Sequence, residues 1–329
     1  MNKYLIALLV CFLIIGFLLW DIYLPKNSLS KKQVLFSIEK GQGSREIALN
    51  LQEQGLVKWS SDFRLYVATK GISSQLQAGS YSLSYSMNVP QMVNKFVLGE
   101  VIKIKLVAPE GYRIKDIEEN LLANGNKTYD ISELKAKDFK GEFGFLKSVP
   151  DSASLEGFLF PDTYEFSYEA SKEDIAKKML DNFDQKLTAV LRQETEKQKK
   201  TIFDIITMAS LIEKEVKTKE DKEIVSGILW KRLKSKMPLQ VDATILYLTA
   251  KENSNVSIDE TKIDSPYNTY KYLGLPQGPI CNPGIESIQA AIYPKSSVYW
   301  YYLSTPEGKT IFSRTLEEHN IAKYKYLKN

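Results

Sequence analysis

The sequence predicts an α+β protein that combines one N-terminal membrane-spanning helix with two folded parts. Three observations support this prediction. Residues 4–20 form an apolar stretch without a charge, residues 33–100 read as strand, helix, helix and strand in that order, and the remainder mixes amphipathic helices with short alternating strands. The chain has 329 residues, of which 43% are hydrophobic, so it can build more than one core.

The apolar stretch has about the minimum length of a membrane span. Its seventeen residues, 4–20, follow Lys3 and precede Asp21 and the helix-breaking Pro25. Lysines lie on both sides of the stretch, so the flanking charges alone do not fix which end faces the cytoplasm.

The end of this stretch indicates a signal anchor that is not cleaved. A cleaved signal peptide has small side chains before its cleavage site, whereas large apolar side chains occupy residues 18–20. We therefore expect a transmembrane signal anchor over residues 4–23. It follows a cytoplasmic N-terminus of residues 1–3 and precedes a polar linker of residues 24–32.

Composition excludes several classes of function. Of the two cysteines, Cys11 lies in the apolar stretch and is badly placed to pair with Cys281, so we expect no disulfide framework. His319 is the only histidine, and no cluster of Cys and His has ligand spacing, so we predict neither a metal site nor a cofactor. The net charge is +4 with acidic and basic residues interspersed, which does not favour a nucleic-acid partner.

The first folded part is predicted to span residues 33–100. The apolar pattern and the turn residues predict a strand at 34–38, a helix at 44–51, a helix at 60–69, a strand at 79–83 and a helix at 90–96. This order resembles the LysM fold, a small module that in other proteins binds chains containing N-acetylglucosamine. The alternative is a module that only positions its neighbour above the membrane.

Residues 101–154 are predicted to form a connecting α/β segment. An alternation of apolar residues and lysines at residues 101–108 predicts a half-buried strand. The tripeptide Pro109-Glu110-Gly111 predicts a turn, and a helix is expected to follow through Leu122.

A glutamate interrupts the apolar face of a helix predicted at residues 201–216. The apolar residues recur at helical spacing, and they are Ile202, Ile205, Ile206, Ala209, Ile212 and Val216. On a helical wheel Glu213 falls between Ile202 and Ile206, whereas Glu215 falls beside Asp204 on the polar side. Glu213 is therefore the expected buried carboxylate, and Glu215 is expected at the surface.

A carboxylate among apolar side chains suits proton transfer. Desolvation raises the pKa of a carboxylic acid, and a general acid must hold its proton near neutral pH. The alternative is structural: Glu213 lies near the predicted helix end, where it could form a buried ion pair or a cap.

Several sequence blocks resemble those of one known family. The segment ASLIEKE at residues 209–215 resembles the catalytic helix of the MltG-type, or YceG-like, endolytic murein transglycosylases. Further blocks that match in the same order are LEGFLFPDTY at 155–164, LQVDATILY at 239–247, SPYNTY at 265–270, GLPQGPI at 274–280, NPG at 282–284 and His319-Asn320. Cys281 departs from the small or hydroxylic residue usual there.

The resemblance implies a catalytic domain at residues 155–329 with Glu213 as its catalytic acid and base. In such enzymes the glutamate protonates the glycosidic oxygen between N-acetylmuramic acid and N-acetylglucosamine. It then takes the proton of the C6 hydroxyl, which closes a 1,6-anhydro ring without water. The family cuts within nascent peptidoglycan strands and so influences their length. A two-carboxylate hydrolase and a noncatalytic peptidoglycan-binding scaffold are the alternatives.

The matching blocks also supply candidate substrate-binding residues. Flat aromatic faces, hydrogen-bonding side chains and second carboxylates all suit a sugar site. The candidates are Glu156, Tyr164, Gln240, Asp242, Thr244, Tyr267, Asn268, Thr269, Tyr270 and His319.

The resemblance also implies where the protein works. Peptidoglycan lies outside the cell membrane, so we expect a single-pass membrane protein with its catalytic domain on the extracytoplasmic side. Peptidoglycan strands are the expected substrate, and peptidoglycan synthases are expected neighbours.

Overall fold

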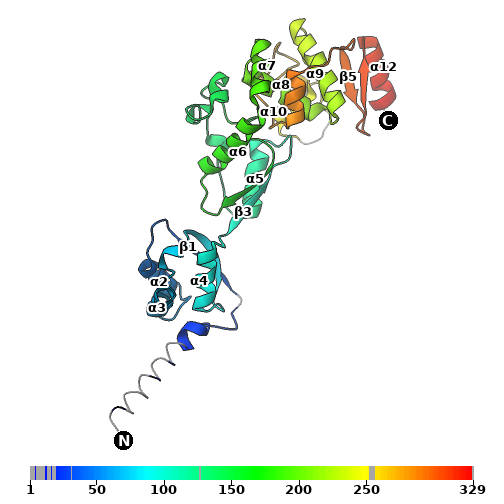
Figure 1. Ribbon diagram of the computed structural model, residues 1–329. Coiled ribbons are helices and arrows are strands. Elements are labelled where there is room, and N and C mark those ends of the chain that lie inside the picture. Colours follow the sequence, from blue (N-terminus) through cyan, green and yellow to red (C-terminus); the bar gives the residue numbers. More distant parts are fainter. Residues whose placement is uncertain are drawn as a thin grey trace. The chain divides into compact units, whose positions relative to one another are not determined.

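The computed structural model describes residues 4, 12, 16, 20–30, 32–125, 127–251 and 256–327. The chain divides into two compact units. The first unit comprises Met1–Ile104 and Glu165–Ala170, and the second comprises Lys105–Tyr164 and Ser171–Asn329. Mixed helices and short two-stranded sheets make this an α+β fold, as the sequence predicts (Figure 1).

Most of the predicted signal anchor, residues 4–23, lies outside the described residues. Within the part of the chain that is described, no helix has the length and apolar character needed to cross a membrane.

The first unit contains the predicted strand, helix, helix, strand and helix. These are β1 (Gln33–Ile38), α2 (Ser44–Glu53), α3 (Ser60–Lys70), β2 (Gly79–Ser84) and α4 (Val89–Leu98), with a short 3₁₀ turn, η1 (Ser73–Gln75), before β2. The strands pair antiparallel from Gln33 opposite Ser84 to Ile38 opposite Gly79. In the core, the ring of Phe96 contacts the rings of Phe36, Phe63 and Tyr81.

The boundary between the units runs through two paired strands, β3 (Lys103–Val107) and β4 (Thr163–Ser167). The first confirms the strand predicted at residues 101–108. The helix predicted after the Pro-Glu-Gly turn is present as α5 (Ile114–Gly125). Four 3₁₀ segments also belong to the second unit: η2 (Ile131–Glu133), η3 (Ala136–Asp138), η4 (Gly144–Ser148) and η5 (Glu260–Lys262).

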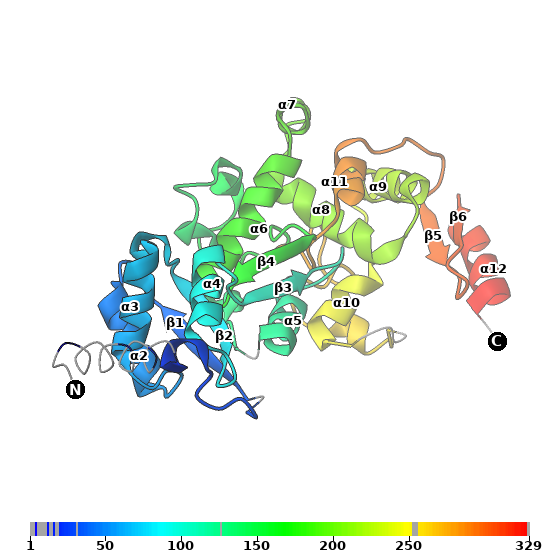
Figure 2. The same ribbon diagram turned by 60° about the horizontal axis from the view of Figure 1, so that its bottom comes forward.

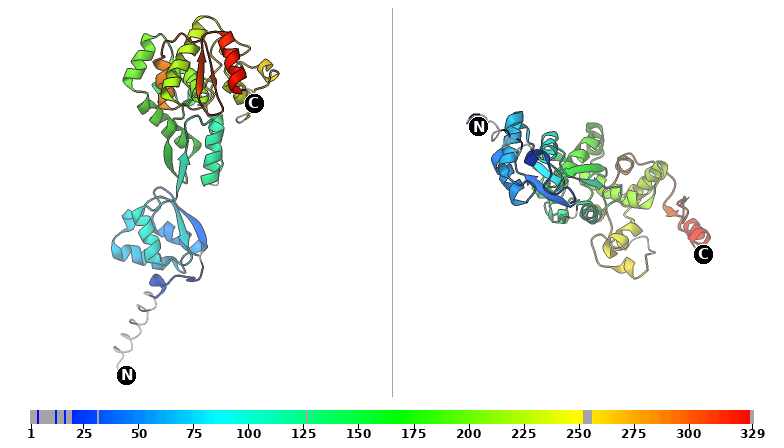
Figure 3. Two further views of the ribbon diagram at one scale, coloured as in Figure 1. Left: turned by 90° about the vertical axis from the view of Figure 1, so that its right-hand side faces the viewer. Right: turned by 90° about the horizontal axis from the view of Figure 1, so that it is seen from below.

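The rest of the second unit is built mainly from helices. In chain order they are α6 (Lys172–Lys186), α7 (Ala189–Lys197), α8 (Ile202–Glu215), α9 (Lys219–Lys234), α10 (Asp242–Thr249), α11 (Ile285–Ile292) and α12 (Leu316–Leu327). A hairpin of β5 (Tyr301–Ser304) and β6 (Thr310–Ser313) packs against α12 (Figure 3).

Helix α8 is the central element of the second unit. It begins at the predicted place because the Thr201 hydroxyl accepts a hydrogen bond from the Asp204 N–H at 3.0 Å, while the Asp204 carboxylate bonds back to the Thr201 N–H. Every residue from Ile205 to Ile212 is buried. The helix packs against α9, α10 and α11 (Figure 2).

Candidate active site

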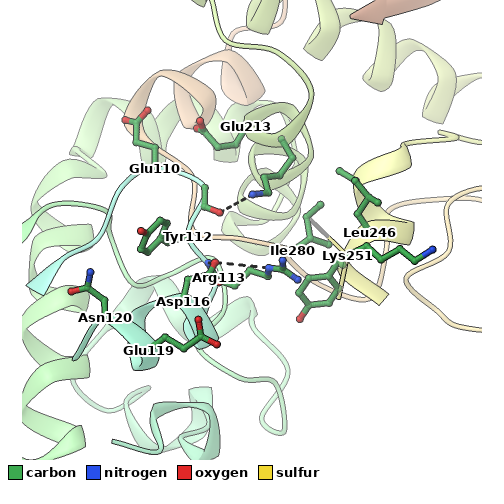
Figure 4. A pocket seen from close by; sticks show the side chains of 14 residues that line it. Glu110, Tyr112, Arg113, Asp116, Glu119, Asn120, Glu213, Leu246, Lys251 and Ile280 are labelled. Carbon is green, nitrogen blue, oxygen red and sulfur yellow. Dashed lines mark hydrogen bonds and ion pairs between the residues drawn. The ribbon is translucent and has the colours of Figure 1, made fainter. Parts of the chain in front are cut away.

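The second unit contains an open cavity of about 580 Å³ at the end of α8. Its wall is formed by the loop at residues 110–113, the first turns of α5, the last turn of α8, and α10. Figure 4 shows polar and charged side chains pointing into this space. Of the predicted site residues, Glu213 alone belongs to the cavity wall among the residues described.

The carboxylate of Glu213 is held at the N-terminus of α11. The N–H of Gly284, the residue before that helix, donates to Glu213 Oε2 at 3.0 Å. The hydroxyl of Ser287 donates to the same oxygen at 2.6 Å. The N-terminus of a helix favours a negative charge, so α11 orients and stabilises this carboxylate.

A buried lysine completes the surroundings of Glu213. Lys222 Nζ, on the first turn of α9, lies 3.3 Å from Oε1 and 3.5 Å from Oε2. The side chains are 3% exposed for Lys222 and 9% exposed for Glu213. The buried ion pair considered as a structural alternative is therefore present, and one of its partners also lines the cavity.

The expectation that apolar side chains surround the Glu213 carboxyl group is wrong. The helix buries its apolar face as predicted, but α9 and α11 bring hydrogen-bond donors to the carboxylate itself. Lys222 could have been noticed in the sequence, since it lies three residues before Val225 on the packed face of its own helix. The prediction overlooked Lys222 because residues 217–223 are almost all charged, which is typical of an exposed segment.

A second glutamate, Glu110, lies close to Glu213 in the cavity wall. The carboxyl group of Glu110 lies against Gly284, where even a Cβ atom would overlap it. Partial burial raises the pKa of Glu110, and the negative charge of Glu213 raises it further, while Lys222 opposes the shift. Sequence reasoning missed this residue because a Pro-Glu-Gly turn carries no sign of what its side chain faces.

The loop that carries Glu110 is fixed by a buried hydrogen-bond network. The Gly111 N–H donates to the Asn282 carbonyl at 2.9 Å, and Asn282 Nδ2 donates to the Tyr112 carbonyl at 3.0 Å. Lys214 Nζ donates to the Gly111 carbonyl at 3.1 Å and so connects the loop to α8. Glu110 and Glu213 are thereby held on one rigid frame.

Glu156 belongs to this network and not to the cavity wall. Its carboxyl group accepts from the Ile114 N–H at 3.2 and 3.3 Å and from Asn282 Nδ2 at 3.2 Å. Burial raises its pKa to about 8. Asn282 Oδ1 also accepts from the N–H groups of Gly157 and Leu159. The structure thus places Glu156 where it supports the start of α5.

The prediction that Glu215 lies at the surface is wrong. Its side chain is half-buried, and burial raises its pKa to about 7. The charge of Asp242 adds to that increase, while hydrogen bonds from Tyr302 and from the Ala243 N–H oppose it. The elements that cover Glu215, α10 and β5, follow it by many residues, so helical phase alone did not reveal them.

Most of the candidate residues in 239–270 form hydrogen bonds at the start of α10 and within residues 261–271. Thr244 and Thr269 are buried, their hydroxyl groups lie 3.1 Å apart, and Thr269 also accepts from the Val241 N–H. Asn268 is fully buried, with its amide donating to two carbonyl groups and its oxygen accepting from two N–H groups. Gln240 is exposed.

Two further candidates in this segment, Asp242 and Tyr270, bind each other. The Tyr270 hydroxyl donates to Asp242 Oδ1 at the first residue of α10. The ring of Tyr267 lies 5.1 Å from that of Tyr247, which lines the cavity, so Tyr267 supports the wall from behind.

The remaining two candidates lie away from the cavity wall. Tyr164 is buried, its hydroxyl donates to the Phe160 carbonyl at 2.6 Å, and burial raises its pKa to about 12. His319 on α12 stacks on Tyr301 at 5.3 Å, and burial lowers its pKa to about 4. Their direct contact with substrate stays a prediction.

The arrangement as a whole suits proton transfer to a polar substrate. One carboxylate is fixed by donors, a second lies beside it, and the rest of the wall offers hydrogen-bonding groups such as Arg113 and Asn120. Within the described residues, no cluster of three or more His, Cys, Asp or Glu side chains could hold a metal ion.

Comparison with known proteins gives consistent relatives. The model of the YceG-like family matches residues 36–325. The chain is 35% identical over 318 residues to an endolytic murein transglycosylase of Bacillus subtilis (strain 168), covering 92% of this chain and 87% of the relative. It is 33% identical over 339 residues to an endolytic murein transglycosylase of Streptococcus pneumoniae (strain ATCC BAA-255 / R6), covering 92% of this chain but 60% of that relative.

A solved structure agrees with these matches. The crystal structure of a YceG-like protein from Listeria monocytogenes superimposes with a TM-score of 0.61 at 35% sequence identity, covering 89% of this chain and 100% of that one. The match to the family model includes the helix that carries Glu213. This chain belongs to the YceG-like family.

Proposed function

We propose that this chain is an endolytic murein transglycosylase that cuts peptidoglycan glycan strands within their length, with Glu213 as a catalytic carboxylate. The observation that carries the proposal is the placement of Glu213. Its carboxylate is fixed by Gly284, Ser287 and Lys222 and lies in the wall of an open polar cavity. The relatives named endolytic murein transglycosylase support the same activity.

The proposed reaction is an intramolecular displacement. The C6 hydroxyl oxygen of N-acetylmuramic acid attacks C1 as the bond from C1 to the glycosidic oxygen breaks. A carboxylic acid of the cavity wall gives its proton to the leaving oxygen, and the ionised Glu213 accepts the proton of the C6 hydroxyl group, so the enzyme gains no net proton. The product is a 1,6-anhydromuramic acid end, and no water is consumed. A fixed carboxylate suits this step because its lone pairs are already oriented.

The substrate is proposed to lie along the cavity wall. Arg113, Asp116, Asn120 and Tyr247 offer hydrogen bonds and one flat ring to a sugar chain. The candidates from the sequence that lie outside the wall, such as Asn268 and Glu156, would then act by holding the loops in place.

The proposal places the protein in the cell membrane. The charge-free residues 4–20 act as a single-pass anchor, and the catalytic domain faces the extracytoplasmic side where peptidoglycan lies. Anchoring confines the cavity to a layer above the bilayer and raises its effective concentration near newly made strands. Peptidoglycan synthases are the proposed neighbours, and the strand and helix order of residues 33–100 supports a LysM-like glycan-binding module.

Product analysis in isotopically labelled water tests the reaction. The full-length protein in detergent is incubated with purified glycan strands in H₂¹⁸O, and the products are examined by mass spectrometry, with Glu213→Gln as the blank. We expect internal cleavage to 1,6-anhydro ends that carry no ¹⁸O. Reducing ends that contain ¹⁸O would show a hydrolase, and equal products from both proteins would remove Glu213 from the reaction. Binding without cleavage would favour the scaffold.

A further inference from the structure

We propose that Glu110 is a second catalytic residue, which donates the proton to the glycosidic oxygen while Glu213 serves as the base. This inference rests on the proposed function and divides between two side chains the roles that the family resemblance gives to one. Glu110 reaches the cavity from the loop before α5, and Glu213 reaches it from the end of α8 (Figure 4).

The contacts of Glu213 favour a base over an acid. Its Oε2 accepts from the Gly284 N–H and the Ser287 hydroxyl, and Lys222 pairs with both oxygens. A backbone N–H and an ammonium group can only donate, so they stabilise the charged carboxylate and leave little room for a proton on it. The proton needed by the leaving oxygen therefore requires another source.

Glu110 is accessible where that proton is needed. Its side chain is exposed to the cavity, and among the described residues its carboxyl group has no hydrogen-bond or ion-pair partner. It lies against Gly284, the same residue that donates to Glu213. A substrate oxygen in the cavity can thus approach Glu110 without displacing an existing contact.

The pair of carboxyl groups favours one shared proton. Two carboxyl groups close together resist double ionisation, so the less stabilised member keeps a proton. Glu213 has the donors, which leaves the proton on Glu110. The raised pKa of Glu110, caused by partial burial, by Glu213 and by Glu286 against the effect of Lys222, agrees with this division.

The other titratable groups of the cavity are less suited to the task. Lys222 is buried and is held by Glu213, so it cannot reach a substrate oxygen. Asp116 accepts from the Arg113 N–H at 2.8 Å, and Glu119 pairs with Lys115 at 3.6 Å. Glu110 is the carboxyl group in the described cavity wall that lies beside Glu213 and keeps its oxygens free.

The proposed step balances with two proton transfers. The Glu110 carboxyl proton moves to the glycosidic oxygen as the bond from C1 to that oxygen breaks. The C6 hydroxyl oxygen bonds to C1, and its proton moves to Glu213. The enzyme then holds its proton on Glu213 and not on Glu110, and exchange with solvent in the open cavity restores the starting state.

A substrate that needs no acid tests this assignment. A glycan oligomer with 4-methylumbelliferone at C1 of its terminal N-acetylmuramic acid releases a weakly basic phenolate, which leaves without protonation. We expect Glu110→Gln to lower kcat on natural strands by about 100-fold and kcat on the aryl substrate by less than about 5-fold. Glu213→Gln is expected to lose activity on both. The thermal unfolding midpoint of each variant confirms that it folds.

A second variant tests the same idea without changing Glu110. Gly284→Ala places a methyl group where the Glu110 carboxyl group lies, while the N–H that binds Glu213 remains. The flexible end of Glu110 can move aside, so we expect a folded protein with a roughly 10-fold lower kcat on natural strands and a smaller loss on the aryl substrate.

The outcomes separate this inference from the proposed function. Glu110→Gln that equals the wild type on natural strands, or that loses both substrates equally, overturns the acid role while the function stands. A wild-type protein that cleaves neither substrate overturns the proposed function and this inference together.

Discussion

Glu213 and Glu215 lie two residues apart on the last turn of α8, yet their carboxyl groups have different surroundings. Glu213 meets an N–H group, a hydroxyl group and a buried ammonium group at the cavity wall. Glu215 turns towards α10 and β5, where burial and Asp242 raise its pKa to about 7. The difference teaches that a raised pKa alone does not identify the reactive carboxylate, because Glu215 has a raised pKa and lies outside the cavity wall.

A matched pair of substitutions provides the strongest test of this comparison. Glu213→Gln is expected to reduce cleavage of glycan strands by about 1,000-fold, because it removes the base. Glu215→Gln is expected to stay within about 5-fold of the wild type, since its carboxyl group does not line the cavity. Release of soluble fragments from purified strands measures both. An equal loss in the two variants would contradict the division of roles.

Lys222 distinguishes the two carboxylates in their contribution to stability. Lys222→Met leaves the Glu213 carboxylate buried without its cation, which is expected to lower the free energy of unfolding by about 3 kcal/mol. Urea unfolding of the purified protein measures this change. Adding Glu213→Gln to Lys222→Met should recover part of the loss, because no unpaired charge then remains.

Glu215→Gln combined with Lys222→Met is the control for the Glu213→Gln and Lys222→Met double variant. Its effect is expected to add to that of Lys222→Met, since Lys222 pairs with Glu213 and Glu215 faces other residues. Strictly additive behaviour of Glu213→Gln would show that the ion pair carries no coupling energy.

The pH dependence of stability should report Glu215. Its pKa is about 7 in the folded state against 4.5 as the ordinary value, so the folded state binds the proton more tightly. The contribution of Glu215 to the free energy of unfolding is therefore most favourable at low pH and falls as pH rises from about 4.5 to about 7. Since the side chain is partly exposed, the expected loss is on the order of 2 kcal/mol.

Glu215→Gln isolates this effect from that of Glu156, whose pKa is also raised. The variant cannot ionise, so its stability relative to the wild type should increase between pH 4.5 and pH 8 by the same amount. Chemical unfolding at several pH values measures it. A constant difference across that range would contradict the raised pKa of Glu215.

The sequence was informative where local pattern determines structure. The order of elements in residues 33–100, the strand before the Pro-Glu-Gly turn and the helix that carries Glu213 all follow from periodicity and capping, and all are present. Thr201 and Asp204 show why, because a helix start depends on residues three apart. The sequence blocks that resemble those of the YceG-like family then predicted the activity.

The contacts around Glu213 could not be predicted in the same way. Gly284 and Ser287 lie more than seventy residues from Glu213 in the chain, with separations of 71 and 74. Glu110, which lies against Gly284, precedes Glu213 in the sequence, whereas Gly284 and Ser287 follow it. A helical wheel describes only one helix, so it identified the buried face of α8 but not the donors that other elements bring to it.

The smallest expected effect concerns the side of α8 on which Glu215 lies. Tyr270→Phe removes the hydroxyl group that donates to Asp242 but keeps the ring, so we expect a loss of about 1 kcal/mol in the free energy of unfolding. KM for glycan strands should change by less than about 2-fold if this side of α8 only supports the fold. Tyr270→Ala is the informative companion, because it also removes the ring. A KM that rises several-fold in Tyr270→Ala at unchanged kcat would place a sugar on that ring and extend the substrate path beyond the cavity beside Glu213.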